Sequence, residues 1–133
     1  MKKSFSLSWI TSKQPRKQRK FRYNAPKHVR HKLMAAHLSK DLRTKYKKRS
    51  FPLRIKDRVK VLTGQFKGKI GEIERIDIKK YKVHVKDVDF KRGEGQKTPY
   101  PLHPSNLQII SLDLDDKKRK EAIERNVKKK SSE

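Results

Sequence analysis

The amino-acid sequence predicts a mainly β fold, in which a small, strongly bent antiparallel barrel carries charged segments at both ends. Apolar and polar residues alternate in about five short runs between residues 55 and 112, the period expected of half-buried strands. Turns rich in glycine and proline separate these runs. Only 32% of the 133 residues are hydrophobic, so a single core must be small.

Charge divides the chain into three parts. Residues 1–54 carry 18 lysines and arginines and one acid, residues 55–112 carry 13 and 7, and residues 113–133 carry 8 and 6. We therefore expect a basic extension over 1–54 that binds an anion, the β barrel over 55–112, and a charged helix or tail over 113–133. The net charge is +25, and the like charges repel one another. The chain therefore requires a polyanion or an anionic surface as partner.

Several classes of protein are excluded by what the sequence lacks. Cysteine is absent, which rules out disulfides and thiolate metal sites. No apolar run approaches the length of about 18 residues that a membrane span needs. The first eleven residues alternate apolar residues with serines and contain no continuous hydrophobic core of a signal peptide. We expect an intracellular protein that is not secreted and does not interact with a membrane.

The extension begins with a cationic run, KQPRKQRKFRYNAP, that contains no acid. Its cations can neutralise phosphates, and the interleaved Phe21 and Tyr23 can stack on exposed bases. The alternative is a solvated, disordered tail that serves as a nuclear-import signal. The cations of the run are Lys13, Arg16, Lys17, Arg19, Lys20 and Arg22.

Two short helices are expected after this run. Asn24 can cap the first, with Pro26 in its first turn, and Ser39 can cap the second. Both helices have narrow apolar stripes, so docking on the barrel or on RNA must stabilise them. The stripes consist of Val29, Leu33 and Ala36 in the first helix and Leu42 and Tyr46 in the second.

The strands of the barrel follow in order. Val59 and Val61 mark the first, and the second, over residues 70–78, changes parity and so predicts a bulge near Glu74–Arg75. The remaining elements are a strand over 81–85, a polar loop over 91–98, a proline-bearing edge strand over 100–102, a turn over 103–106 and a closing strand over 107–112.

Glycine recurs in the stretch VKVLTGQFKGKIGEI as Gly64, Gly68 and Gly71. A P-loop needs one more residue between its glycines and a Ser or Thr after its lysine, where this chain has Ile70. A nucleotide loop is therefore excluded. Gly64 fits a turn, and Gly71 fits a strand position that a neighbouring backbone or RNA approaches closely.

Residues 55–73 resemble a KOW motif, with an apolar strand, Gly64, Lys67–Gly68, and Gly71 two residues before an aliphatic. The flanking stretches NAP, LSKDLR and LHPSN resemble the archaeal and eukaryotic branch of one family of large-subunit ribosomal proteins. This family is called L twenty-six in eukaryotes and is the counterpart of bacterial L twenty-four. The resemblance runs from about Lys13 to about Lys120, whereas residues 1–12 do not look like the usual start.

The resemblance implies an SH3-like KOW barrel in a structural protein of the large ribosomal subunit. Family members bind large-subunit rRNA near the peptide exit tunnel, beside neighbouring large-subunit proteins, and their bacterial counterparts bind early in assembly. It implies a cytoplasmic, ribosomal location, with nuclear and nucleolar passage if the source is a eukaryote. We expect no homo-oligomer and no small-molecule substrate. Two alternatives stay open: a KOW module of a transcription elongation factor and a general RNA chaperone.

The predicted RNA-binding residues extend beyond the cationic run and its two aromatics. The other candidates are Lys27, Arg30, His31, Lys32, Arg49, Lys67, Lys69 and His103. His28 and His31 are three apart on a predicted helix, but the surrounding cations repel a divalent ion, so we expect no metal and no cofactor. No nucleophile has a base at motif spacing, and we expect no enzymatic activity.

The C-terminal run is predicted to form a short helix. Asp115 and Asp116 favour its N-terminal end, and the lysines at 128–130 favour its C-terminal end. Ile123 and Val127 are its internal apolar pair. The sequence leaves two interpretations open, a surface helix that lies along RNA and a frayed tail.

Overall fold

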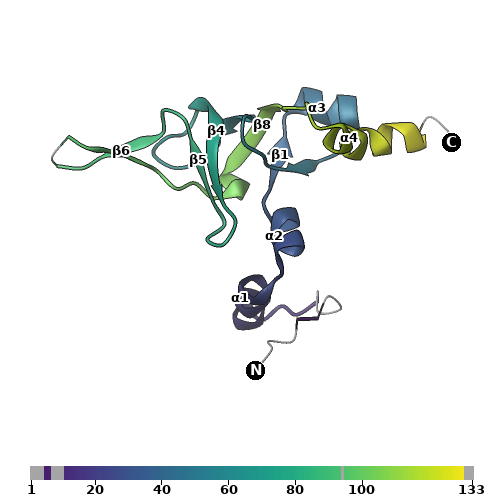
Figure 1. The fold of residues 1–133 in the computed structure, drawn as a ribbon, viewed down its shortest axis with the longest axis horizontal. Coiled ribbons are helices and arrows are strands. Elements are labelled where there is room, and N and C mark those ends of the chain that lie inside the picture. The colour runs from purple at the N-terminus through teal and green to yellow at the C-terminus, as the bar shows by residue number, and fades with distance from the viewer. Residues whose placement is uncertain (1–4, 7–10, 94, 131–133) are drawn as a thin grey trace.

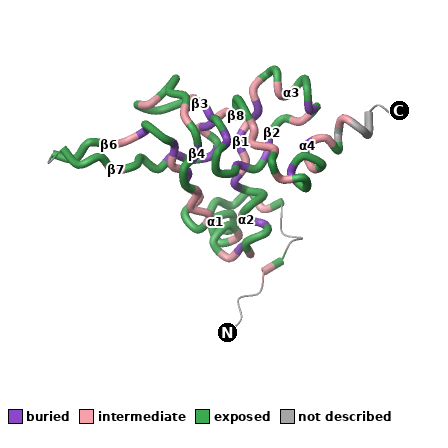
Figure 2. The backbone as a smooth tube through the Cα atoms, turned by 45° about the horizontal axis from the view of Figure 1, so that its top comes forward, coloured by how far each residue is buried: buried purple, intermediate pink, exposed green. Residues whose placement is uncertain are grey.

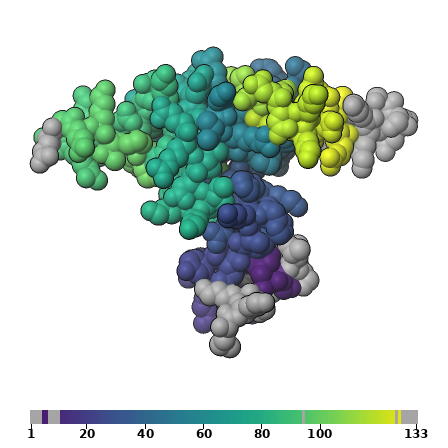
Figure 3. Space-filling model, in the orientation of Figure 1, coloured from purple at the N-terminus to yellow at the C-terminus, as the bar shows by residue number. Residues whose placement is uncertain are grey.

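The computed structural model describes residues 5–6, 11–93 and 95–130. The N-terminal helices form a stem below a body that consists of the strands and the C-terminal helix (Figures 1 and 3). Within the described residues, no helix is long and apolar enough to cross a membrane. The helices are α1 (Pro15–Asn24), α2 (Lys27–Leu33), α3 (Lys40–Tyr46) and α4 (Lys117–Lys130), with a 3₁₀ turn, η1 (Pro104–Asn106).

The strands confirm the predicted mainly β class. They are β1 (Ala35–Leu38), β2 (Ser50–Pro52), β3 (Arg58–Val61), β4 (Ile70–Asp77), β5 (Lys82–Val85), β6 (Asp89–Lys91), β7 (Lys97–Pro99) and β8 (Leu107–Ser111). Six of them form one sheet in the order β2-β1-β8-β3-β4-β5, in which β1 runs parallel to β8. In the described part of the chain its edges β2 and β5 do not pair, so the sheet is open and mixed, not a closed antiparallel barrel.

The core lies among the strands of the main sheet, and the tube in Figure 2 is purple around β1, β4 and β8. Val59 and Val61 of β3 and Val83 and Val85 of β5 are each at most 1% exposed. Their alternation with exposed or partly exposed residues confirms the predicted period. The pairing of β4 with β5 shifts register between Ile73 and Arg75, which confirms the predicted bulge.

Residues 1–54 contribute more to the core than their charge indicates. β1 pairs with β2 and β8, and its Ala36 and Leu38 are buried. The prediction that Ala36 completes a helical stripe is therefore wrong, and Leu33, from the same stripe, is 40% exposed. The short apolar run over 34–38 fits either period, and pairing with β8 decides for a strand.

The capping predictions divide between the two helices. Asn24 is the last residue of α1, a helix that the sequence did not predict, and Pro26 is the N-cap of α2, which has no side-chain cap. The predicted Asn24 cap is therefore wrong. At α3 the prediction is confirmed, because Ser39 Oγ accepts from the Leu42 backbone N–H at 3.4 Å and Tyr46 is buried.

The region between β5 and β8 differs most from the prediction. Residues 91–98 were expected to form a loop, but β6 and β7 pair from Asp89 to Pro99 as a hairpin that projects from the body (Figure 1). The expected edge strand over 100–102 is reduced to an isolated bridge between Leu102 and Val83. The turn over 103–106 and the closing strand from Leu107 are confirmed.

The C-terminal helix docks on the body through a buried ion pair. The Arg119 guanidinium donates from Nη1 to Asp57 Oδ1 at 2.7 Å and from Nη2 to Asp57 Oδ2 at 2.6 Å. Asp57 is 0% exposed and Arg119 is 5% exposed. Ile123 is also fully buried in the core. The predicted C-terminal helix is therefore present, and its contact with RNA stays a prediction.

Candidate nucleic-acid interface

Helix α1 presents five of the predicted RNA-binding cations, and none of its residues is buried. Four exposed cations, here called the α1 quartet, are Arg16, Lys17, Arg19 and Lys20. Lys13 is exposed just before the helix, and Tyr23 is 72% exposed near its end. Phe21 instead lies against Phe5, with ring centroids 4.9 Å apart. The cations of the α1 quartet are therefore exposed on the surface and are not buried by packing within the described chain.

The end of α1 is fixed to the rest of the protein by two side chains. Tyr81, between β4 and β5, donates its hydroxyl to the Arg22 carbonyl at 2.9 Å. Arg30 of α2 donates from Nε to the Ala25 carbonyl at 2.7 Å and from Nη2 to the Tyr23 carbonyl. Arg30, a predicted RNA contact, thus also holds the junction between α1 and α2.

A groove lies between the start of α2 and the end of β4, with a volume of about 740 Å³. Its walls carry five groups that are cationic or can become so, against a single acid, Asp77. Three of these groups were predicted from the sequence, whereas Arg75 and Lys79 were not. The five are Lys27, Arg30, His31, Arg75 and Lys79.

Positive charge also gathers beside the groove, around Tyr81. Burial raises the pKa of the Tyr81 hydroxyl, and the charges of Arg30 and Arg22 act in the opposite direction. Burial, followed by the charges of Lys82 and Arg22, lowers the pKa of His103. Strand β5, the turn before η1 and the stem therefore meet in one basic region.

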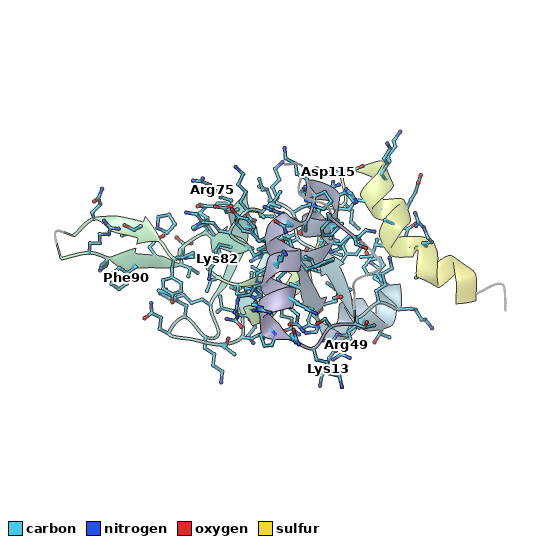
Figure 4. The ribbon with its side chains drawn as sticks, turned by 90° about the horizontal axis from the view of Figure 1, so that it is seen from below. Lys13, Arg49, Arg75, Lys82, Phe90 and Asp115 are labelled. Carbon is cyan, nitrogen blue, oxygen red and sulfur yellow. The ribbon has the colours of Figure 1, made fainter. Side chains whose placement is uncertain are left out.

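Besides Lys79, sequence reasoning missed two cations on strands, Arg75 in the groove and Lys82 near His103. Both sit on strands, where a cation usually indicates only a solvated face. Figure 4 shows both on the hairpin side of the stem helices, whereas Lys13 and Arg49 lie on the other side in that view. The alternation in β5 could have placed Lys82 on the polar face of that strand. Only the fold shows that this face lies towards the stem.

The KOW glycines take the expected places, with Gly64 and Gly68 in the connection between β3 and β4 and Gly71 in strand β4. Gly64 and Gly68 have φ values of +92° and +89°. A Cβ on Gly71 would lie 2.7 Å from the Lys86 carbonyl oxygen, which confirms the predicted close approach of a neighbouring backbone. Lys67 is exposed in the same connection.

The remaining candidates are less concentrated. Lys69 Nζ donates to the Asp87 carbonyl at 3.3 Å and lies 5.0 Å from the centroid of the Phe66 ring. Lys32 is exposed on α2, and Arg49 is exposed just before β2. The structure therefore joins the stem residues and His103 in one region and places the KOW lysines on a separate connection.

The arrangement of the histidines and acids offers no metal site within the described residues. Across 5–6, 11–93 and 95–130, no group of three or more His, Asp or Glu side chains could hold a metal ion. His28 and His31 are both exposed on α2. The exposed cations of α1 and of the groove can contact an anionic partner.

Comparison with known proteins agrees with this surface. A family model that describes the ribosomal proteins called L26 in eukaryotes and their archaeal L24 counterparts matches residues 12–126. The "Large ribosomal subunit protein uL24" of Methanosphaera stadtmanae is 46% identical over 116 residues. That alignment covers 87% of this chain and 99% of the archaeal protein.

Proposed function

The chain belongs to this family of eukaryotic and archaeal ribosomal proteins, and from that premise we propose that it is a structural component of the large ribosomal subunit that binds large-subunit rRNA. The observation that carries the proposal is the 46% identity to an archaeal large-subunit protein, of which the alignment covers 99%. The chain therefore corresponds to that protein as a whole, and not to one shared module.

The physical basis of binding is the release of counterions from RNA phosphates. The α1 quartet and the basic region beside the groove supply the cations, and arginine adds bidentate phosphate contacts that lysine lacks. If about eight phosphates are neutralised, log affinity falls with log salt with a slope on the order of −6 to −7. Arg30 and Tyr81 connect α1, and with it the quartet, to α2 and to the turn between β4 and β5.

The finer parts of the function rest on the family likeness. In this proposal the protein lies near the peptide exit tunnel, contacts neighbouring large-subunit proteins and supports subunit assembly. It acts without catalysis and resides on cytoplasmic ribosomes, with passage through the nucleus if the source is a eukaryote. The basic stem would be the part that RNA orders and orients.

Sedimentation of a cell extract through a sucrose gradient at moderate salt tests the proposal. The chain should co-migrate with large subunits and whole ribosomes and remain with them after a salt wash. A chain that stays at the top of the gradient contradicts the proposal. A chain that migrates with RNA polymerase contradicts it as well and supports the transcription-factor alternative.

A further inference from the structure

We propose that the groove between α2 and the end of β4 binds one unstacked nucleotide of the RNA, with its base on an apolar floor and its Watson–Crick edge at Asp77. This inference rests on the proposed function and names one subsite within it. The groove is a distinct hollow of about 740 Å³, within the range of about 300–1,000 Å³ typical of small-molecule sites.

The floor of the groove suits the face of a base. It is formed by Ala25 and Pro26 from the junction of the stem and by Ile76 and Ile78 from the end of β4. Ala25 is 4% exposed, so the floor is anchored in the protein. Bases that leave a helix lose stacking, and apolar side chains that cover their faces replace part of it.

The rim of the groove suits the phosphates on either side of that base. Lys27 and His31 lie on one wall, and Arg75 and Lys79 lie on the other. Arg30 is held by backbone carbonyls and acts as a support of the wall. Charge complementarity thus selects an anionic occupant that also has an apolar face, a combination that a nucleotide provides.

Asp77 gives the groove a means to distinguish bases. Its Oδ1 accepts the backbone N–H groups of Lys79 and Lys80 at 3.0 and 3.1 Å, which fixes the orientation of the carboxylate. Hydrogen bonds from these backbone groups, led by Lys80, lower the pKa of Asp77, so the carboxylate is ionised and can only accept. Its Oδ2 has no hydrogen-bond partner in the described part of the chain and is available to a ligand.

The chemistry of the bases then sets the order of preference. Guanine presents two adjacent donors, N1–H and N2–H, to the free oxygen Oδ2, whose two lone pairs can accept both. A two-donor contact of this kind discriminates bases by about tenfold. Uracil presents its single N3–H between two carbonyl oxygens, which the carboxylate repels. We therefore expect guanine to be preferred and uracil to bind least well.

NMR titration of the full ¹⁵N-labelled chain with GMP and UMP tests the site. GMP should shift the amide signals of residues 27–31 and 75–80, with an affinity about tenfold above that of UMP. Asp77→Asn keeps an oxygen for the turn but replaces Oδ2 with a donor, so this preference should disappear. Asp87→Asn removes the same charge from an exposed turn and should retain it.

The same variants extend the test to rRNA. Kethoxal modifies the N1 and N2 atoms of guanine, so one guanine protected by the wild-type chain should become reactive with Asp77→Asn but not with Asp87→Asn. Equal shifts by GMP and UMP, or no shift at these residues, would overturn the proposal even if the chain sediments with large subunits. Larger groove shifts with a Glu-rich peptide than with GMP would overturn it in favour of a protein partner. Loss of co-sedimentation would instead refute the proposed function.

Discussion

The buried pair between Arg119 and Asp57 yields the sharpest prediction of stability. Asp57 accepts four hydrogen bonds, two from Arg119 and one each from the backbone N–H groups of Arg54 and Asp113, at 2.8 and 3.0 Å. Arg119 also donates to the carbonyls of Asp113 and Pro52. One guanidinium therefore connects α4 to β2 and to the segment that precedes β3.

Replacement of Arg119 with methionine retains much of the apolar stem but removes the charged guanidinium, whose Cζ lies 5.5 Å from the centroid of the Phe51 ring. The Asp57 carboxylate, which is 0% exposed, is then left with two backbone donors and no counter-charge. Removal of one partner from a buried ion pair costs about 3–5 kcal/mol. If α4 undocks to admit water, the burial of Ile123 is lost instead, a change worth about 1.5–3 kcal/mol. We therefore expect a loss of about 3 kcal/mol in the free energy of unfolding.

Urea denaturation followed by far-UV circular dichroism measures this loss. Arg125→Met is the matched control, because Arg125 is an exposed arginine on the same helix, and it should change stability by less than about 0.5 kcal/mol. A shift for Arg119→Met no larger than that of the control would refute the reasoning.

The glycine connection, the stem and the turn before η1 each carry a further prediction. Gly71→Ala places a Cβ 2.7 Å from the Lys86 carbonyl oxygen and should cost about 1–3 kcal/mol in urea denaturation, with a loss below about 0.5 kcal/mol counting against this tight approach. Replacement of the α1 quartet with alanine should flatten the slope of log rRNA affinity against log salt by roughly three, whereas an unchanged slope would remove α1 from the interface. Because burial and two neighbouring cations lower the pKa of His103 from 6.5, its neutral ring contributes stability above pH 6.5 that is lost as the pH falls through the lowered pKa. His103→Gln should reduce that loss in urea midpoints measured across this range, and an identical pH profile would contradict the assignment.

The strands that the sequence predicted are those in which every second side chain is buried in the core. Val59, Val61, Val83 and Val85 alternate with polar residues, and this local pattern is sufficient to indicate both the strand and its buried face. Ser39 belongs to the same class, because a cap depends on residues within one turn. The cationic character of the stem is likewise a property of composition alone.

Other features depend on partners that are distant in the chain. Ala36 becomes part of a strand because β8 lies beside it, and Arg119 is buried because Asp57, 62 residues earlier, receives it. Neither the pairing of β1 with β8 nor the pairing of Arg119 with Asp57 leaves a local pattern in the sequence. Both depend on the tertiary contacts of segments that are distant in the chain.

The candidate site divides in the same way. Composition and periodicity are enough to identify a polycation with a small β core, and the motifs indicated the family. The groove between α2 and the end of β4, where Arg75 and Asp77 join Lys27, could be found only in the folded chain. The physical reason is that charge and period are local properties, whereas a cavity exists only between segments that folding brings together.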